Sequence, residues 1–290
     1  MVMIIKVQNV DDCRICDDFL TLLIQDERKY DATIDASFVV KDYFVNMIND
    51  MNILLLYKED NVSGGYIFAR RVSNGYLIDG LYVDIDFRNR GIATKLIKEV
   101  IKLIRLEGDY EIFIKVMKKN KDACLLYKKL GFIIDFQDNL RYLMSYSNCE
   151  LEKASLYDIE RIKEYKLKII LEYADNLEKN EIEDIYRYIN DSILYQIDEY
   201  KNIIFDDKIV GSVLVKKIKD GYLLDEIFIE DAYRNKNIGT NVIKRIINDS
   251  DKNIYLWVYK ANIRAIKLYK LLGFKIKEET DTRYYMQYLK

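Results

Sequence analysis

One stretch of the chain combines residue types that suit the binding of a phosphate group. It runs from Val83 to Thr94 and holds the pattern Arg88-x-x-Gly91-x-Ala93 between a strand-like and an amphipathic helix-like segment. The first turn of a helix offers unpaired backbone N–H groups and the positive end of the helix dipole. Small residues let a diphosphate approach these groups. The pattern is neither a P-loop nor a dinucleotide fingerprint. A surface turn that only caps a helix is the alternative, but the position and recurrence of the pattern favour phosphate binding.

Two carboxylates lie where a carboxylate is costly. Asp79 and Asp225 each interrupt an apolar strand-like segment, which is unfavourable unless the group is paired or used. Because side chains alternate along a strand, we expect Asp79 on the same face as Leu81 and Val83. Such a group could accept a proton, bind a substrate ammonium ion or cap a neighbouring loop. Glu226, beside Asp225, is a second candidate.

The chain repeats itself. Residues of the first half recur 146 positions later around the phosphate pattern and 142 positions later further on, as in the pairs Asp79/Asp225, Arg88/Arg234, Asn120/Asn262 and Tyr127/Tyr269. So many ordered identities predict two copies of one domain, placed at residues 1–147 and 148–290. The second phosphate pattern has Asn237 in place of the middle glycine. Asparagine is among the non-glycine residues most tolerant of left-handed backbone, so we expect the loop to persist.

Hydrophobic periodicity predicts the same element order in both halves: strand, two helices, three strands, helix, strand, helix, two strands. In the first half the predicted segments after the two helices include strands at 53–57, 65–69 and 76–83, a helix at 92–104, a strand at 111–116 and a helix at 123–130. The second half repeats this with a helix at 238–247, a strand at 253–258 and a helix at 265–272. The predicted class is α/β, with two tandem α+β domains, each a mixed and mostly antiparallel sheet flanked by helices.

Composition excludes several kinds of chemistry. The 290 residues contain no histidine and no proline, so triad catalysis and His-based metal centres are excluded, and no metal is expected. Cys13 and Cys16 form the one Cys-x-x-Cys pair, which we interpret as two reduced thiols on one helix. Lys and Arg number 46 against 48 Asp and Glu, which gives no electrostatic footprint for nucleic acid. No membrane span or signal peptide is apparent, and a cytoplasmic location is expected.

The two halves resemble the GNAT superfamily of acyl-CoA-dependent N-acetyltransferases over nearly the whole chain. In the first half the resemblance rests on Arg88-x-x-Gly91-x-Ala93 with Asn120-x-x-Ala123-x-x-Leu126-Tyr127-x-x-Leu130-Gly131-Phe132. In the second it rests on Arg234-x-x-Asn237-x-Gly239 with Asn262-x-x-Ala265-x-x-Leu268-Tyr269-x-x-Leu272-Gly273-Phe274. The resemblance implies a sheet that opens between its fourth and fifth strands, with CoA in the opening.

The resemblance also implies cofactor contacts, with acetyl-CoA as the co-substrate. In the first half these are the pantetheine-binding strand, the diphosphate-binding loop and two later side chains: Leu81, Tyr82, Val83, Arg88, Asn89, Arg90, Gly91, Ile92, Ala93, Thr94, Asn120 and Tyr127. The matching set in the second half is Ile227, Phe228, Ile229, Arg234, Asn235, Lys236, Asn237, Ile238, Gly239, Thr240, Asn262 and Tyr269. Asn120 is expected to contact pantetheine or to orient the following helix.

By the same resemblance, an amine attacks the thioester directly in a ternary complex. Tyr127, and Tyr269 in the other half, would protonate the departing thiolate, although a tyrosine on an apolar helical stripe is more often core. Asp79 and Asp225 would accept the proton of the amine. A backbone N–H at a bulge of the fourth strand would stabilise the oxyanion.

Three functions stay open at the level of the sequence. Both halves could be active N-acetyltransferases, one half could be active with a degenerate partner half, or the chain could be a non-catalytic acetyl-CoA-binding module. The acceptor, a small-molecule or peptide amine, is not identified. The segment 25–31 could recognise a cationic amine, although a solvated helix end is the simpler interpretation. We expect a monomer whose two domains pack as a pseudo-dimer.

Overall fold

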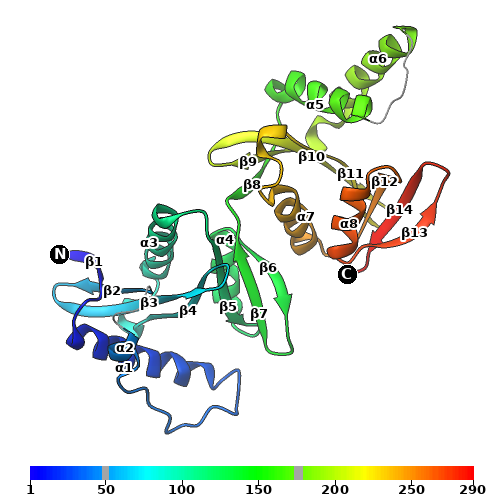
Figure 1. The fold of residues 1–290 in the computed structure, drawn as a ribbon. Helices are drawn as coiled ribbons and strands as arrows, with labels where there is room; N and C mark the ends of the chain where they lie inside the picture. Colours follow the sequence, from blue (N-terminus) through cyan, green and yellow to red (C-terminus); the bar gives the residue numbers. More distant parts are fainter. Residues whose placement is uncertain (48–51, 173–178) are drawn as a thin grey trace. The chain divides into compact units, whose positions relative to one another are not determined.

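The computed structural model describes residues 1–47, 52–172 and 179–290. The chain forms two compact units, Met1–Tyr146 and Ser147–Lys290. Each unit is built on one seven-stranded mixed sheet with helices on both faces (Figure 1). The predicted class and element order are confirmed.

The first unit follows the predicted order of elements. These are β1 (Val2–Lys6), α1 (Val10–Glu27), α2 (Tyr43–Met47), β2 (Ile53–Glu59), β3 (Val62–Val72), β4 (Gly75–Val83), α3 (Ile92–Glu107), β5 (Glu111–Met117), α4 (Lys121–Lys129), β6 (Phe132–Gln137) and β7 (Arg141–Tyr146). The strand order is β1-β2-β3-β4-β5-β7-β6. Among these neighbours, β4 and β5 run parallel and the other pairs are antiparallel.

The second unit repeats the first. Its elements are β8 (Cys149–Lys153), α5 (Ile159–Glu172), α6 (Lys179–Gln196), β9 (Tyr200–Phe205), β10 (Lys208–Ile218), β11 (Gly221–Ile229), α7 (Ile238–Asp249), β12 (Asn253–Tyr259), α8 (Ile263–Leu271), β13 (Lys275–Glu279) and β14 (Arg283–Tyr288). Here β11 and β12 are the parallel pair.

Each sheet separates two hydrophobic cores. In the first unit, α3 and α4 cover one face, and α1 and α2 cover the other (Figure 1). Helix α3 packs through Ile92, Leu96, Ile97, Val100 and Ile104, which recur at helical spacing and are buried. Cys13 and Cys16 lie buried on α1 against the other face, and burial raises the pKa of both thiols. They therefore act as core residues of the fold.

Candidate functional site

The site begins where β4 and β5 separate. The two strands pair from Gly75 with Glu111 to Ile78 with Ile114, and no further pairing follows although both strands continue. In the second unit β11 and β12 separate at the same place, after Leu224 and Leu256. The edge of β4 that faces β5 therefore has unpaired backbone groups beyond Ile78, which can bond to a ligand that lies in the opening. The predicted opening between the fourth and fifth strands is confirmed.

A β-bulge marks the point of separation. Phe68 pairs with Gly80 whereas Ala69 pairs with Ile78, so Asp79 is the extra residue of β4. In the second unit the same irregularity leaves Asp225 between Leu224 and Glu226. A bulge places one residue outside the alternation of the strand.

The bulge corrects one expectation about faces. Leu81 lies with the core under α3. Burial raises the pKa of Tyr43 and Tyr66, which lie on the α1–α2 side, and the nearby charge of Asp79 raises both pKa values further. Asp79 therefore faces α1 and α2, and the prediction that it shares a face with Leu81 and Val83 is wrong. The extra residue shifts the alternation by one position.

The strand beyond the bulge is held by its side chains. Tyr82 packs on Phe19 of α1 with ring centroids 5.7 Å apart, and Phe228 stacks on Tyr165 of α5 at 4.6 Å. Leu81 and Val83 pack against the α3 core, as Ile227 and Ile229 pack against the core under α7. The side chains leave the backbone edge to the opening.

The helix after this strand starts without a side-chain cap. Gly91 is the N-cap of α3, with φ 73° and ψ 12°, and within the described residues no side chain caps the first helical amides. A β-carbon at Gly91 would meet no atom within 4 Å. Asn237 occupies the same position before α7 with φ 58° and ψ 8°. The asparagine thus preserves the left-handed backbone, and Asn89 and Asn235 share a left-handed conformation too.

Two other helices, α4 and α8, do have a side-chain cap at their N-terminus. Helix α4 is capped by Asn120, whose side-chain oxygen accepts from the Ala123 N–H at 3.2 Å, and α8 by Asn262, which accepts from the Ala265 N–H at 3.0 Å. Of the two expected roles of Asn120, the structure gives it the orientation of the following helix. The amides of Ile92, Ala93 and Thr94, and of Ile238, Gly239 and Thr240, form the uncapped starts, which can bind an anion.

The arginine of each loop ties the loop to the sheet. The Arg88 guanidinium donates to the Val83 carbonyl at 2.9 Å and to Asp26 of α1 at 2.9 Å. Arg234 donates to the Ile229 carbonyl at 3.1 Å in the same way. Arg90 pairs with Glu59, and Lys236 lies over the rings of Phe205 and Tyr233. Arg88 and Arg234 thus shape the turn and add positive charge beside it.

The two tyrosines of the later helices lie in the cores. Tyr127 is 7% exposed and packs on Phe132, with centroids 6.0 Å apart, and Tyr269 is 7% exposed and packs on Phe274 at 5.7 Å. Burial raises the pKa of Tyr127 above its usual value, with smaller contributions from Cys124 and Glu27. The Tyr127 hydroxyl therefore keeps its proton at neutral pH and can serve as a proton donor.

Each bulge carboxylate is paired with a cation across the strand. Asp79 lies 2.6 Å from Arg70 Nε, and Asp225 lies 2.5 Å from Lys216 Nζ. The four side chains are 24–37% exposed. A proton or an ammonium ion that binds Asp79 must compete with Arg70.

The sequence did not single out Glu27, at the end of α1. Glu27 lies 3.5 Å from Arg141 of β7, burial raises its pKa against the opposing effect of Arg141, and its charge acts on Tyr127. Because α1 packs on β4 and β7 pairs with β5, this ion pair joins the two sides of the opening. Glu27 lies in the segment 25–31, which the sequence analysis named as able to recognise a cationic amine. Neither spacing nor composition distinguished Glu27 from its neighbours in that segment.

We expect Glu27→Gln to weaken the binding of a cation beside the opening, because it removes a negative charge there. A raised pKa means that Glu27 loses its charge as the pH falls through a range higher than usual for a glutamate, so the acid side of the pH profile of kcat/KM should include its titration. The substitution should raise the KM for a diamine about tenfold, flatten that limb and leave CoA affinity unchanged. Glu99→Gln is the control, since Glu99 of α3 is likewise half-buried and paired with a cation, Lys102. Equal profiles for the wild type and Glu27→Gln would contradict the assignment.

Tyr66 carries an unusual hydroxyl near the bulge. The residue is fully buried, and its oxygen has no hydrogen-bond partner in the described part of the chain. A β-carbon at Gly80 would lie 2.5 Å from this oxygen, so the glycine makes room for it.

Tyr66→Phe should therefore raise the free energy of unfolding or leave it unchanged. The substitution removes a buried hydroxyl without a hydrogen bond, and such a group destabilises the folded state by about 1–2 kcal/mol. Tyr76→Phe is the matched control, because the Tyr76 hydroxyl is bonded to Glu107 and Arg71. It should cost about 1 kcal/mol. Urea denaturation of both variants decides; a larger loss for Tyr66→Phe would mean that the hydroxyl is bonded in solution.

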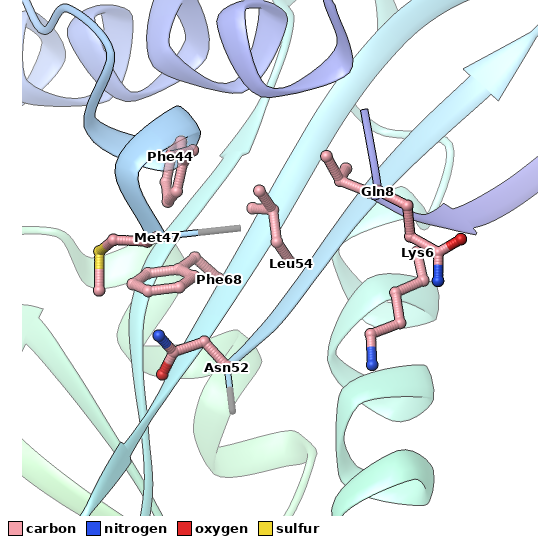
Figure 2. Close-up of a pocket in the computed structure, with 8 residues that line it drawn as sticks. Lys6, Gln8, Phe44, Met47, Asn52, Leu54 and Phe68 are labelled. Carbon is pink, nitrogen blue, oxygen red and sulfur yellow. The ribbon is translucent and has the colours of Figure 1, made fainter. Parts of the chain in front are cut away.

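A cavity of about 170 Å³ lies on the α2 side of the first sheet (Figure 2). Its apolar wall is formed by Phe44, Met47, Leu54 and Phe68, and Lys6, Gln8 and Asn52 supply polar groups (Figure 2). Its lining includes no residue of β4 or β5, so this cavity is not the opening between those strands.

Two further observations bound the site. The described residues include no group of three or more Cys, Asp or Glu side chains placed to hold a metal ion. Across the same residues, no helix is both long and apolar enough to cross a membrane.

A mixed sheet that opens after a bulge, followed by an uncapped helix start, defines the architecture of the GNAT-type N-acyltransferases. The chain belongs to the acetyltransferase (GNAT) family, whose model matches residues 19–132 and 163–274, once in each unit. The resemblance noted from the motifs is confirmed.

Relatives match over shorter stretches. A spermine/spermidine N(1)-acetyltransferase of Bacillus subtilis is 36% identical over 63 residues, which cover 20% of this chain and 41% of that protein. An uncharacterized N-acetyltransferase of Methanocaldococcus jannaschii is 42% identical over 55 residues, 19% of this chain and 24% of that protein. The matched segment thus spans less than half of either relative.

Solved structures match over about one unit. PaiA N-acetyltransferase from Thermoplasma acidophilum, in complex with coenzyme A, has 18% identity and a TM-score of 0.38, covering 51% of this chain and 99% of that one. A putative acetyltransferase from Salmonella typhimurium with acetyl-CoA has 17% identity and a TM-score of 0.42, covering 51% of this chain and 94% of that one.

Proposed function

We propose that the protein transfers an acetyl group from acetyl-CoA to a primary amine by direct attack in a ternary complex. The observation that carries this proposal is the coincidence of three features in each unit: the separation of the parallel strands, the bulge and the uncapped helix start. Together they offer an unpaired strand edge for pantetheine and free amides for the diphosphate. Tandem acetyl-CoA binding without transfer is the alternative.

The residues of the first unit suit each step. Pantetheine would bond to the edge of Leu81, Tyr82 and Val83, and the amides of Ile92 to Thr94 would hold the diphosphate. The carbonyl of the thioester would lie at the bulge, where a backbone N–H can stabilise the oxyanion.

Proton transfers complete the reaction. An alkylamine is protonated at neutral pH, with a pKa of about 10, so it must lose a proton before it attacks. Asp79 or Glu27 would take this proton, directly or through water, and Tyr127 would protonate the departing CoA thiolate. The bond between nitrogen and the acetyl carbon forms first and gives a tetrahedral oxyanion. The carbon–sulfur bond then breaks as Tyr127 gives its proton to sulfur. The second proton that leaves nitrogen restores the Tyr127 hydroxyl, so the products are the amide, CoA thiol and the one proton taken up by the carboxylate.

For the acceptor we propose a small cationic amine. Support comes from the carboxylates Asp79 and Glu27 beside the opening, and from the partial match to a protein named as a spermine/spermidine N(1)-acetyltransferase. Peptide N-termini, amino acids and aminoglycosides belong in the same test.

The test is the release of CoA thiol from acetyl-CoA in the presence of an amine panel that includes spermidine. Mass spectrometry should find a product 42 Da heavier than the amine. Calorimetry with CoA separates the outcomes. CoA binding without thiol release would favour a binding module, and no association at millimolar CoA would remove both functions.

A further inference from the structure

Beside its bulge the second unit has a buried ion pair, where the matched residues of the first unit carry no charge. Lys166 of α5 lies 2.6 Å from Glu226, the residue after the bulge of β11. Lys166 is 5% exposed, and the Glu226 side chain is 15% exposed. The Tyr200 hydroxyl donates to the other oxygen of Glu226 at 2.6 Å, and Lys166 Nζ lies 5.2 Å from the Tyr188 ring centroid.

The corresponding residues of the first unit are uncharged. At the spacing of 146, Lys166 matches Leu20, Glu226 matches Gly80 and Tyr200 matches Leu54. Tyr66, which packs beside Gly80, is matched by Ser212, whose smaller side chain leaves space for Glu226. Several positions around the bulge have thus changed together.

A buried ion pair is costly to keep. Removing a lysine and a carboxylate from water costs several kcal/mol for each ion, and an apolar pair of similar volume is often at least as stable. The network of Lys166, Glu226 and Tyr200 is therefore a weak source of stability. It places a primary ammonium group on the acceptor face of the bulge, on the side where Asp79 and Tyr66 lie in the first unit.

We propose that Lys166 occupies the acceptor position of the second unit, so that this unit binds acetyl-CoA but transfers nothing to a free amine. This inference rests on the proposed function and assigns its two activities to different units. Acetyl transfer belongs to the first unit, and the second unit only binds CoA. Its helix start is equally open, since Asn237 keeps the conformation of Gly91.

A matched pair of variants tests the division. Thr94 and Thr240 hold the same position in the first turns of α3 and α7, so Thr94→Asp and Thr240→Asp each place a carboxylate among the amides of one unit. Calorimetry should find two CoA molecules per wild-type chain and one per chain for either variant. Spermidine turnover should fall at least thirtyfold in Thr94→Asp and by a much smaller factor in Thr240→Asp. Turnover that survives Thr94→Asp and is lost in Thr240→Asp would overturn the inference.

A second experiment opens the second unit. In a Thr94→Asp background, Lys166→Leu with Glu226→Gly copies Leu20 and Gly80, and thiol release with spermidine should rise at least tenfold. Lys166→Leu alone should lower the unfolding midpoint by several degrees, because it leaves Glu226 buried without its cation, and the double substitution should recover most of that loss. A folded double variant that binds CoA without this gain would show that Lys166 is not what blocks the unit.

Two measurements complete the test. Peptide mass spectrometry of wild type after incubation with acetyl-CoA should show Lys166 unmodified; an added 42 Da there would make it an acceptor and overturn the inference. If wild type binds CoA but acetylates no amine, the proposed function fails. The CoA stoichiometry of Thr94→Asp then decides this inference, where one CoA per chain supports it and none contradicts it.

Discussion

Thr94→Asp is expected to lower the affinity of the first unit for CoA by about hundredfold. The new carboxylate would lie at the uncapped start of α3, among the amides assigned to the diphosphate. Two charges about 4 Å apart near a protein surface interact by a few kcal/mol, and about 3 kcal/mol corresponds to a hundredfold change. The same carboxylate complements the helix dipole and should raise the stability of α3 by about 0.3–1 kcal/mol. Binding and stability are therefore expected to change in opposite directions.

Calorimetry with CoA, alongside urea denaturation, measures both quantities. Thr94→Asn is the control, since it has a similar shape and no charge, and it should retain CoA affinity within about threefold. Because the expected repulsion is electrostatic, the loss in Thr94→Asp should shrink as salt is added. Unchanged CoA affinity would mean that the diphosphate does not lie at this helix start.

Tyr127→Phe is expected to lower kcat by about hundredfold, within the range of general acid catalysis. Phenylalanine keeps the ring that packs on Phe132 and removes only the hydroxyl, so CoA affinity and stability should change little. Because burial raises the pKa of Tyr127, its hydroxyl keeps its proton below pH 10 and is lost as a donor only above it. The wild-type kcat should therefore show no alkaline limb from this group below pH 10.

Steady-state thiol release with spermidine, measured from pH 6 to pH 10, checks this prediction. Tyr269→Phe is the matched variant in the second unit, and it should leave kcat within about twofold if transfer belongs to the first unit. An unchanged kcat for Tyr127→Phe would mean that Tyr127 has only a packing role. Water would then be the proton donor.

Much of the architecture could be predicted from the amino-acid sequence because the information is local. Helical and strand periodicities predicted the order of elements, and the repeat spacing predicted two similar units. The type of residue at position 237 predicted the persistence of the second loop, since asparagine accepts the left-handed backbone, and Asn237 adopts φ 58°. The CoA-binding and catalytic assignments of individual residues stay predictions.

Other features depend on contacts between distant segments. Strict alternation placed Asp79 with Leu81, but one extra residue in β4 moves it to the α1–α2 face, and such a bulge is visible only when the partner strand is in register. Glu27 became a candidate because α1 places it beside Arg141, far along the chain.

The difference proposed between the two halves also depends on contacts between distant segments. The sequence by itself determined the family, the repeat and the helix starts, because each depends only on which residues stand at which positions along the chain. Only the tertiary structure decided that Lys166 and Glu226, 60 positions apart, form an ion pair beside the second bulge, whereas the matched Leu20 and Gly80 form none beside the first. The physical reason is that a pair of opposite charges acts at a distance of a few ångströms in space, which separation along the chain does not report.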